Sequence, residues 1–320
     1  MGNITDVPGI KVGHSTDTNS YTGCTVIICE NGAVGGVEVR GMASSTRQID
    51  SLTNIHIVNK IHAVLITGGS AFGLDSAGGV MQYLEERNIG FDVRVTKVPV
   101  VAAAVIFDLS FGDFRKRPDF SMGYAACLNA RKGDIEEGSF GAGTGASVGK
   151  LFGIERATKG GVGTSSVRFS DITVGALAVV NAFGDVIDPL KGTIIAGARS
   201  PDGRTFVDTR AQMKMGVSRR NFIADSTTVA VIATDAMLTR EEACRVARVA
   251  HNAFAKCISP VHTSFDGDTV FVLSTGEKKA DINLISILAE DVLMDAVIRG
   301  VKNANGFGIL PSYSDLFREE

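Results

Sequence analysis

The segment from Ser264 to Leu273 places the strongest constraint on what this chain can fold into and do. A polar, turn-forming run, Ser264-Phe265-Asp266-Gly267-Asp268, changes abruptly into Thr269-Val270-Phe271-Val272-Leu273. The second run is rich in β-branched and aromatic residues, which is typical of a buried strand. The sequence therefore predicts a threonine hydroxyl at the junction between a tight loop and a strand.

Two interpretations of this junction follow from the residues alone. In the first, Asp266-Gly267-Asp268 is an ordinary turn and Thr269 is simply the first residue of a strand, a place that threonine suits. In the second, the chain cuts its own Asp268–Thr269 bond. The new Thr269 would then carry a hydroxyl nucleophile and, on the same residue, an α-amine that can act as its base. An α-amine has an ordinary pKa of about 7.7–8.0, so much of it is neutral near physiological pH.

The composition is that of an ordinary globular protein. With 320 residues, 44% hydrophobic and 21% charged, the chain has enough apolar surface for one folded unit. The net charge of −3 favours neither a nucleic acid nor a membrane surface as a partner. We see no secretory signal and no apolar run of the roughly 20 residues that span a bilayer, so we expect a cytoplasmic protein.

Cysteines and histidines show no metal-binding pattern. The five cysteines include no Cys-x-x-Cys pair, and the five histidines form no His-x-x-x-His pair. Because catalytic and structural metals usually need such spacings, we expect no metal site.

Turn signals and hydrophobic periodicity predict a mixture of strands and helices. Asn31-Gly32 is a typical hairpin signal. Ser70 is a candidate first cap of a helix, and Thr239 with Glu242 forms a capping box for another. The main predicted strands are residues 25–29, 63–67, 172–180 and 228–234, and the final helix is predicted at 284–303. The alternation of strands and helices would suggest a doubly wound sheet, but no dinucleotide-binding fingerprint follows a first strand.

Several short motifs follow one another along the chain. They are Pro8-Gly9-Ile10-Lys11-Val12-Gly13-His14, Val39-Arg40-Gly41, Leu65-Ile66-Thr67-Gly68-Gly69-Ser70-Ala71-Phe72-Gly73-Leu74-Asp75, Val98-Pro99-Val100 with Phe107-Asp108-Leu109, Gly141-Ala142-Gly143-Thr144-Gly145-Ala146, Lys159-Gly160-Gly161-Val162-Gly163-Thr164, Val180-Asn181-Ala182-Phe183-Gly184-Asp185 and the Asp266–Thr269 junction. In this order they resemble the DmpA/NylC family of self-cleaving N-terminal-nucleophile hydrolases. That family includes aminopeptidases, β-peptidases and nylon-oligomer hydrolases.

The resemblance implies an α/β fold, a four-layer α-β-β-α sandwich of the DmpA/ornithine-acetyltransferase type. It implies one catalytic domain, residues 1–320, that cuts itself at Asp268–Thr269 into chains 1–268 and 269–320. It further implies a homo-oligomer, a tetramer of processed protomers, and no cofactor. The expected substrate is a small peptide, an amide or an amide oligomer, hydrolysed through a Thr269 acyl-enzyme.

The resemblance also assigns roles to other polar residues. Lys159 would lie beside the nucleophile and keep the Thr269 amine neutral by charge repulsion. Asn181 would help form an oxyanion hole. Glu290 and Asp291, in the final predicted helix, stand roughly where relatives carry acidic residues that orient the amine. Each residue also has an ordinary interpretation. Lys159 would be a surface lysine, and Asn181 a turn residue in the left-handed conformation. Glu290 and Asp291 would be solvated carboxylates on a helix.

Phe107 departs from the pattern of the family. It stands where relatives often carry a tyrosine whose hydroxyl completes the oxyanion hole, so that hydroxyl is absent here. We expect Phe107 to lie in the same substrate pocket as the Gly-rich loop residues Gly143, Gly145 and Gly160.

Other functions remain open at this point. One is transfer of an acyl group between amino compounds, as in self-cleaving ornithine acetyltransferases. Another is an unprocessed relative that binds small molecules without catalysis. The sequence Gly145-Ala146-Ser147-Val148-Gly149 also matches G-x-S-x-G, but no convincing strand precedes it, as a serine-hydrolase elbow requires.

Overall fold

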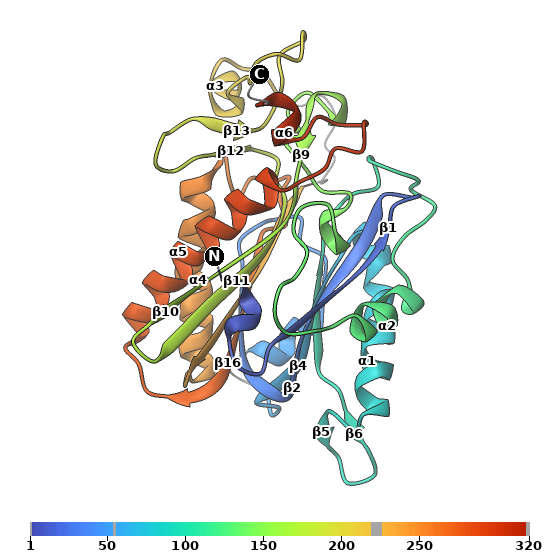
Figure 1. The fold of residues 1–320 in the computed structure, drawn as a ribbon, viewed down its shortest axis with the longest axis vertical. Coiled ribbons are helices and arrows are strands. Elements are labelled where there is room, and N and C mark those ends of the chain that lie inside the picture. The colour runs from blue at the N-terminus through green and yellow to red at the C-terminus, as the bar shows by residue number, and fades with distance from the viewer. Residues whose placement is uncertain (1, 54–55, 219–225, 318–320) are drawn as a thin grey trace.

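The computed structural model describes residues 2–53, 56–218 and 226–317 of the chain (Figure 1). Its main feature is a large mixed sheet in which nine strands are found within these residues. The order along the sheet is β10 (Gly161–Phe169), β11 (Ile172–Asn181), β14 (Thr227–Ala236), β16 (Thr269–Lys278), β2 (Thr22–Val39), β4 (Lys60–Thr67), β7 (Val101–Val105) and β3 (Thr46–Arg47), with β1 (Lys11–Asp17) also paired to β2.

Strand β2 joins two halves of this sheet. Its first part pairs with β4, and its last part, from Val34 to Val39, pairs with β16. Between them the register shifts, since β2 advances from Ile28 to Ala33 while β4 moves only from Ala63 to Ile61. The expected hairpin at Asn31-Gly32 is therefore wrong: these residues lie in a bulge within one long strand. A bulge bends a strand and increases its twist, which suits a strand that serves both halves.

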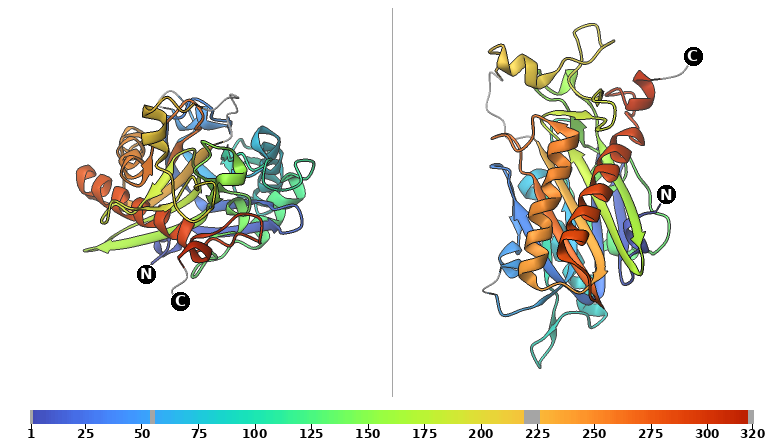
Figure 2. Two further views of the ribbon diagram at one scale, coloured as in Figure 1. Left: turned by 90° about the horizontal axis from the view of Figure 1, so that it is seen from above. Right: turned by 90° about the vertical axis from the view of Figure 1, so that its left-hand side faces the viewer.

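Three hydrophobic clusters show that the two halves are stacked and covered by helices (Figure 2). Helices α1 (Ser76–Glu86) and α2 (Phe120–Leu128) pack on β2, β4 and β7. Helices α4 (Arg240–Cys257) and α5 (Ile282–Lys302) pack on β11, β14 and β16. Between the halves, side chains such as Ile27 and Val64 meet Val231 and Phe271. The four-layer α-β-β-α sandwich is confirmed.

The remaining elements are short. They are β5 (Phe91–Asp92), β6 (Lys97–Val98), β8 (Ser147–Val148), β9 (Thr158–Lys159), β12 (Asp185–Ile187), β13 (Ile194–Ala196), β15 (Ile258–Ser259), α3 (Thr209–Lys214), α6 (Tyr313–Leu316) and 3-10 turns at Ile4–Asp6, Ile49–Leu52, Ser70–Asp75, Gly141–Gly143 and Ile154–Arg156. Within the described ranges, no helix has the length and apolar character needed to cross a membrane.

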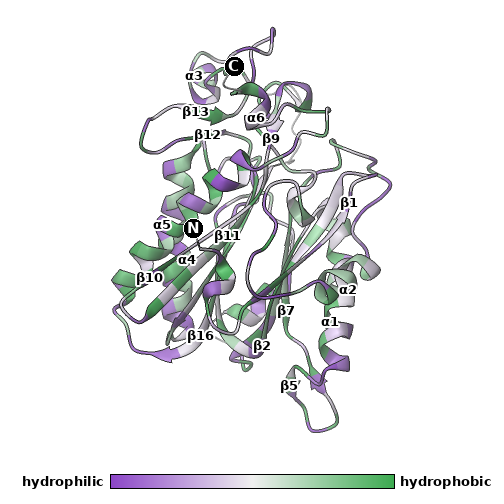
Figure 3. Cartoon of the chain, in the orientation of Figure 1, coloured by the Kyte–Doolittle hydropathy of each residue, from purple (hydrophilic) through white to green (hydrophobic). Residues whose placement is uncertain are grey.

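Helix ends test two sequence expectations. The capping box is confirmed, because the Thr239 hydroxyl accepts from the Glu242 backbone and the Glu242 carboxylate accepts from the Thr239 backbone. The expected cap at Ser70 is wrong. Ser70 opens a 3-10 turn in a left-handed conformation, and α1 begins only at Ser76. On α4 and α5, polar and apolar stripes alternate, as expected for helices with one buried face (Figure 3).

Side-chain alternation along β16 decides which way the junction residues point. Val270 and Val272 belong to the cluster under α4 and α5, whereas Phe271 and Leu273 lie between the two halves of the sheet. Because successive strand residues face opposite sides, Thr269 faces the space between the halves and Asp268 faces the helices.

Candidate active site

Thr269 is completely buried at the start of β16, between two neighbouring strands. It lies opposite Val229 of β14 on one side and Val39 of β2 on the other. Its hydroxyl donates to the carbonyl oxygen of Gly267 at 2.9 Å. The hydroxyl is thus turned back toward the 266–268 turn that precedes its own residue.

Two backbone donors hold the carbonyl of the Asp268–Thr269 peptide bond. The Asp268 carbonyl oxygen accepts from the Arg40 N–H at 3.0 Å and from the Gly41 N–H at 3.3 Å. Two N–H groups converging on one carbonyl oxygen form the arrangement that stabilises a tetrahedral oxyanion in acyl transfer. We call these two N–H groups the Arg40–Gly41 cradle. They bind the carbonyl of the peptide bond on the N-terminal side of Thr269.

Gly41 explains why the Val39-Arg40-Gly41 motif needs a glycine. A Cβ at position 41 would lie 2.3 Å from both the Asp266 carbonyl oxygen and the Asp268 nitrogen, and 2.5 Å from the Gly267 Cα. No real side chain tolerates such contacts. Glycine therefore lets the segment after β2 approach the 266–268 turn closely enough for the Arg40 and Gly41 N–H groups to reach the Asp268 carbonyl oxygen.

Asp266 stabilises the same turn from the other side. Its carboxyl oxygens accept from the Phe183 N–H at 3.1 Å, the Thr263 N–H at 3.0 Å and the Thr263 hydroxyl at 2.5 Å. Burial, and after it the charge of Asp268, raises the pKa of Asp266 above its usual range.

Asn181 ends β11 at the same edge of the sheet. It pairs with Thr227 of β14, two residues before the partner of Thr269, and by alternation it shares the inward face of Leu177 and Val179. Asn181 and Thr269 therefore face the same space between the halves.

Hydrogen bonds with Ser147, Lys150 and Phe107 hold the Asn181 amide in place. Its Oδ1 accepts from the Ser147 N–H at 3.0 Å and from Lys150 Nζ at 2.8 Å, and its Nδ2 donates to the Phe107 carbonyl oxygen at 3.1 Å. The structure thus brings Asn181 and Phe107 together, as the resemblance implied, but through the backbone of Phe107.

Lys150 is the cation that sequence reasoning missed. Its ammonium is buried and contacts both the side chain and, at 3.1 Å, the carbonyl oxygen of Asn181. In the structure, Gly149 adopts a positive φ of 76° and turns the chain directly before the lysine, a conformation that the sequence does not reveal. Ser147 lies in the two-residue strand β8, and its N–H binds Asn181.

Lys159, the lysine expected beside the nucleophile, is fully buried but differently engaged. Its ammonium donates to the carbonyl oxygens of Gly143, Ala146 and Gly160 at 2.8–2.9 Å. These three acceptors match the three hydrogens of a charged lysine. Burial nonetheless lowers the pKa of Lys159 to about 7, with the charge of Asp108 opposing that shift. The contacts show a side chain that fixes the Gly-rich loop.

The expected pocket glycines lie around this lysine. Gly143 and Gly160 supply two of its acceptors. A Cβ on Gly145 would lie 2.5 Å from the Asp108 Cβ and 2.6 Å from the Tyr21 carbonyl oxygen. Asp108 accepts from the Thr22 hydroxyl and the Gly69 N–H, and burial raises its pKa. The glycines thus allow close packing of the loop against Asp108.

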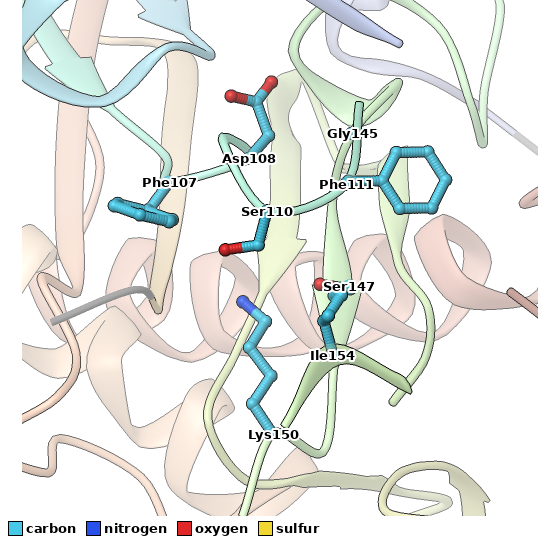
Figure 4. A pocket seen from close by; sticks show the side chains of 8 residues that line it. All are labelled: Phe107, Asp108, Ser110, Phe111, Gly145, Ser147, Lys150 and Ile154. Atoms are coloured by element: carbon cyan, nitrogen blue, oxygen red, sulfur yellow. The ribbon is translucent and has the colours of Figure 1, made fainter. Parts of the chain in front are cut away.

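A small cavity lies beside these residues (Figure 4). Its volume is about 10 Å³, enough for one water molecule. Lys150 Nζ and the Ser110 hydroxyl point toward one another across it (Figure 4). The lining residues are Phe107, Asp108, Ser110, Phe111, Gly145, Ser147, Lys150 and Ile154.

Glu290 and Asp291 lie away from this space. Both belong to α5, on the outer side of the sheet, where Glu290 pairs with Lys256 of α4 and Asp291 is exposed. Because Thr269 faces the opposite side, the structure does not bring these carboxylates to it. Over the described parts of the chain, no cluster of histidine, cysteine, aspartate or glutamate is arranged to hold a metal.

Comparison with known proteins gives a family and a fold. The model of peptidase family S58 matches residues 2–310. A Mycobacterium leprae protein named as an uncharacterized aminopeptidase is 38% identical, over 99% of this chain and 94% of its own. The 6-aminohexanoate-oligomer endohydrolase of Kocuria sp. is 28% identical over 93% of this chain and 85% of its own.

A solved structure has the same fold. It is the L-aminopeptidase D-Ala-esterase/amidase of Ochrobactrum anthropi, described as a new variant of the Ntn hydrolase fold. The TM-score is 0.73 at 20% identity, covering 95% of this chain and 86% of that one. With a family model spanning almost the whole sequence and a relative 38% identical from end to end, the chain belongs to peptidase family S58.

Proposed function

We propose that this chain is an N-terminal-nucleophile hydrolase that cuts its own Asp268–Thr269 bond and then uses Thr269 to hydrolyse small amides. One observation carries the proposal. The Asp268 carbonyl oxygen rests on the Arg40 and Gly41 N–H groups, next to the buried Thr269 hydroxyl. The names of the relatives, aminopeptidases and amide-oligomer hydrolases, support the substrate class.

Self-cleavage begins with attack of the Thr269 Oγ1 on the Asp268 carbonyl carbon. Negative charge develops on the carbonyl oxygen, where the two N–H donors stabilise it. The C–N bond then breaks, and the proton lost by the hydroxyl ends on the departing Thr269 nitrogen. Water hydrolyses the resulting ester, which leaves a carboxylate on Asp268 and a free hydroxyl and α-amine on Thr269.

The processed enzyme repeats this chemistry on a substrate. The Thr269 amine accepts the proton of its own hydroxyl as Oγ1 attacks an amide carbonyl. The leaving amine takes a proton, an acyl-enzyme ester remains, and water releases the acid.

We assign two further roles near Thr269. Asn181 supplies an amide donor for the substrate oxyanion, since it shares the inward face of the sheet with Thr269. Lys150 supplies positive charge through its contact with Asn181 Oδ1. Lys159 holds the Gly-rich loop through three backbone carbonyl oxygens. Glu290 and Asp291 have no part in this scheme because they lie on the outer face.

Two variants of the nucleophile test the proposal. Thr269→Ser keeps a hydroxyl and an α-amine, so the chain should still be cut and should hydrolyse an amino-acid p-nitroanilide. Thr269→Ala lacks the hydroxyl, so it should remain one 320-residue chain without activity. Intact mass and release of p-nitroaniline measure both outcomes. A processed or active Thr269→Ala protein would refute the scheme.

A further inference from the structure

The side chain of Asp268 is anchored on the opposite face of the strand from the nucleophile. It is 1% exposed and points toward α4 and α5. Its Oδ1 accepts from the Thr228 N–H at 2.8 Å. Its Oδ2 faces the His262 N–H at 3.2 Å and His262 Nδ1 at 2.8 Å. Three donors therefore converge on one buried carboxylate.

His262 adopts a conformation that suits this double contact. Its φ is +54°, in the left-handed region where histidine, asparagine and aspartate are enriched. Because a carboxylate only accepts, the ring hydrogen must lie on Nδ1. Nε2 is buried without a hydrogen-bond partner among the residues that the structure describes. The ring packs edge-on against His251 of α4, with centroids 4.9 Å apart.

These contacts hold the carbonyl half of the bond that is cut. The backbone carbonyl of Asp268 is held by Arg40 and Gly41, which directly follow β2, while its side chain is held by β14 and by the loop that carries His262. A residue fixed at both places cannot rotate its carbonyl out of the Arg40–Gly41 cradle. Holding reacting groups in a near-attack geometry contributes much of a rate enhancement, and a misplacement of about 1 Å can cost roughly 100-fold.

We propose that His262 is a positioning residue for self-cleavage. Through its two hydrogen bonds to the Asp268 carboxylate, it keeps the scissile carbonyl in the cradle without touching the nucleophile. The inference rests on the proposed self-cleavage. Its effect ends with that step, because in the processed enzyme a substrate carbonyl takes the place of Asp268. His262 therefore controls maturation and leaves turnover unchanged.

Two substitutions of His262 separate hydrogen bonding from packing. His262→Leu keeps an apolar bulk against His251 but has no side-chain donor. His262→Asn loses the ring, but its amide nitrogen occupies the δ position of the ring nitrogen and can donate to Asp268. Asparagine also suits the left-handed conformation. A role in ring packing is preserved better by leucine, whereas a role in positioning is preserved better by asparagine.

The rate of self-cleavage is measured by intact mass after cell-free synthesis, so that time is counted from translation. We expect His262→Leu to slow cleavage about 10- to 100-fold, the range set by loss of a charge-assisted bond and misplacement of the carbonyl. His262→Asn should cleave at close to the wild-type rate. Asp268→Asn places an amide N–H group among the donors from Thr228 and His262, so it should slow cleavage. The double variant with His262→Leu should cleave little more slowly than Asp268→Asn alone, because both substitutions remove the same contact.

Two controls show whether folding alone explains the rates. In a Thr269→Ala background no variant can cut itself, so thermal unfolding of Thr269→Ala with and without His262→Leu compares the folded states directly. Turnover of a p-nitroanilide, normalised to cleaved protein, should be equal in wild type and His262→Leu.

The possible results are distinct. A wild-type chain that never cuts itself refutes the proposed function. If wild type cuts itself, the positioning role is overturned by equal rates in His262→Leu, by equal slowing in His262→Asn, or by a turnover that falls in parallel with the cleavage rate. Slow cleavage in His262→Leu, rescue in His262→Asn and unchanged turnover support it.

Discussion

Replacement of Gly41 by alanine should stop or strongly slow self-cleavage. The new Cβ would lie 2.3 Å from the Asp268 nitrogen and from the Asp266 carbonyl oxygen. Ordinary carbon contacts need more than about 3 Å, so β2 and the 266–268 turn must separate by about 1 Å. The Arg40 and Gly41 N–H groups, now 3.0 and 3.3 Å from the Asp268 carbonyl oxygen, would then no longer bind it.

The size of the effect follows from the loss of these donors. Removing one oxyanion donor costs about 2.7–4 kcal/mol, or roughly 100- to 1,000-fold in rate. Because both donors are displaced together, we expect at least a 100-fold slower cleavage of Gly41→Ala. The measurement is the fraction of uncut chain over time, by intact mass after cell-free synthesis.

A matched glycine controls for the general effect of the substitution. Gly133 has a positive φ of 88°, and a Cβ there would meet nothing within 4 Å. Gly133→Ala should therefore lose some stability but cleave at the wild-type rate. Unfolding of Gly41→Ala in the uncut Thr269→Ala background shows whether the chain still folds. A folded Gly41→Ala chain that cuts itself at the wild-type rate would refute the role of the cradle.

Three further predictions concern buried charged and titratable groups. Lys150→Met should lower turnover of a p-nitroanilide by about 10-fold or more, because it removes a charge-assisted bond to Asn181; unchanged turnover would exclude Lys150 from the site. Lys159→Met leaves three buried carbonyl oxygens without their donor, so denaturant unfolding should show a loss of about 3 kcal/mol; wild-type stability would contradict the role given to this lysine. Burial lowers the pKa of His14 to about 4, so the unfolded chain binds its proton more tightly and stability should be lost as the pH falls from about 6.5 to 4. In His14→Asn the unfolding free energy should fall less over this range, and an equally steep fall would show that other groups cause it.

Regular patterns in the sequence predicted individual strands and helices well, whereas the four-layer arrangement was implied by the family resemblance. The strand at Thr269–Lys278 and the helix at Ile282–Lys302 follow from runs and stripes of apolar residues. The capping box at Thr239 depends on a spacing of three residues, which is visible in one dimension. The bulge at Asn31-Gly32 was not predictable, since the local signal is that of a hairpin. Only the pairing of β2 with both β4 and β16 excludes a reversal there.

For the candidate site, the sequence places residues at strand ends better than residues in the irregular loop. Thr269 and Asn181 stand at strand ends, so strand register alone brings them to one edge. Which lysine lies near Asn181 depends on the path of an irregular Gly-rich loop, whose sequence has no periodic pattern from which that path could be predicted. Lys159 and Lys150 both lie in that region, and only their contacts distinguish a loop anchor from a neighbour of Asn181. The tetramer and the cytoplasmic location stay predictions.

The most direct test of this account is the intact mass of the purified protein together with N-terminal sequencing. We predict two fragments, residues 1–268 and 269–320, with the smaller one beginning Thr-Val-Phe-Val. They should stay together under native conditions, because β16 lies between β14 and β2 within the sheet. A single uncut chain that persists for days at several pH values, or a cut at another bond, would contradict the assignment of Thr269 as the nucleophile.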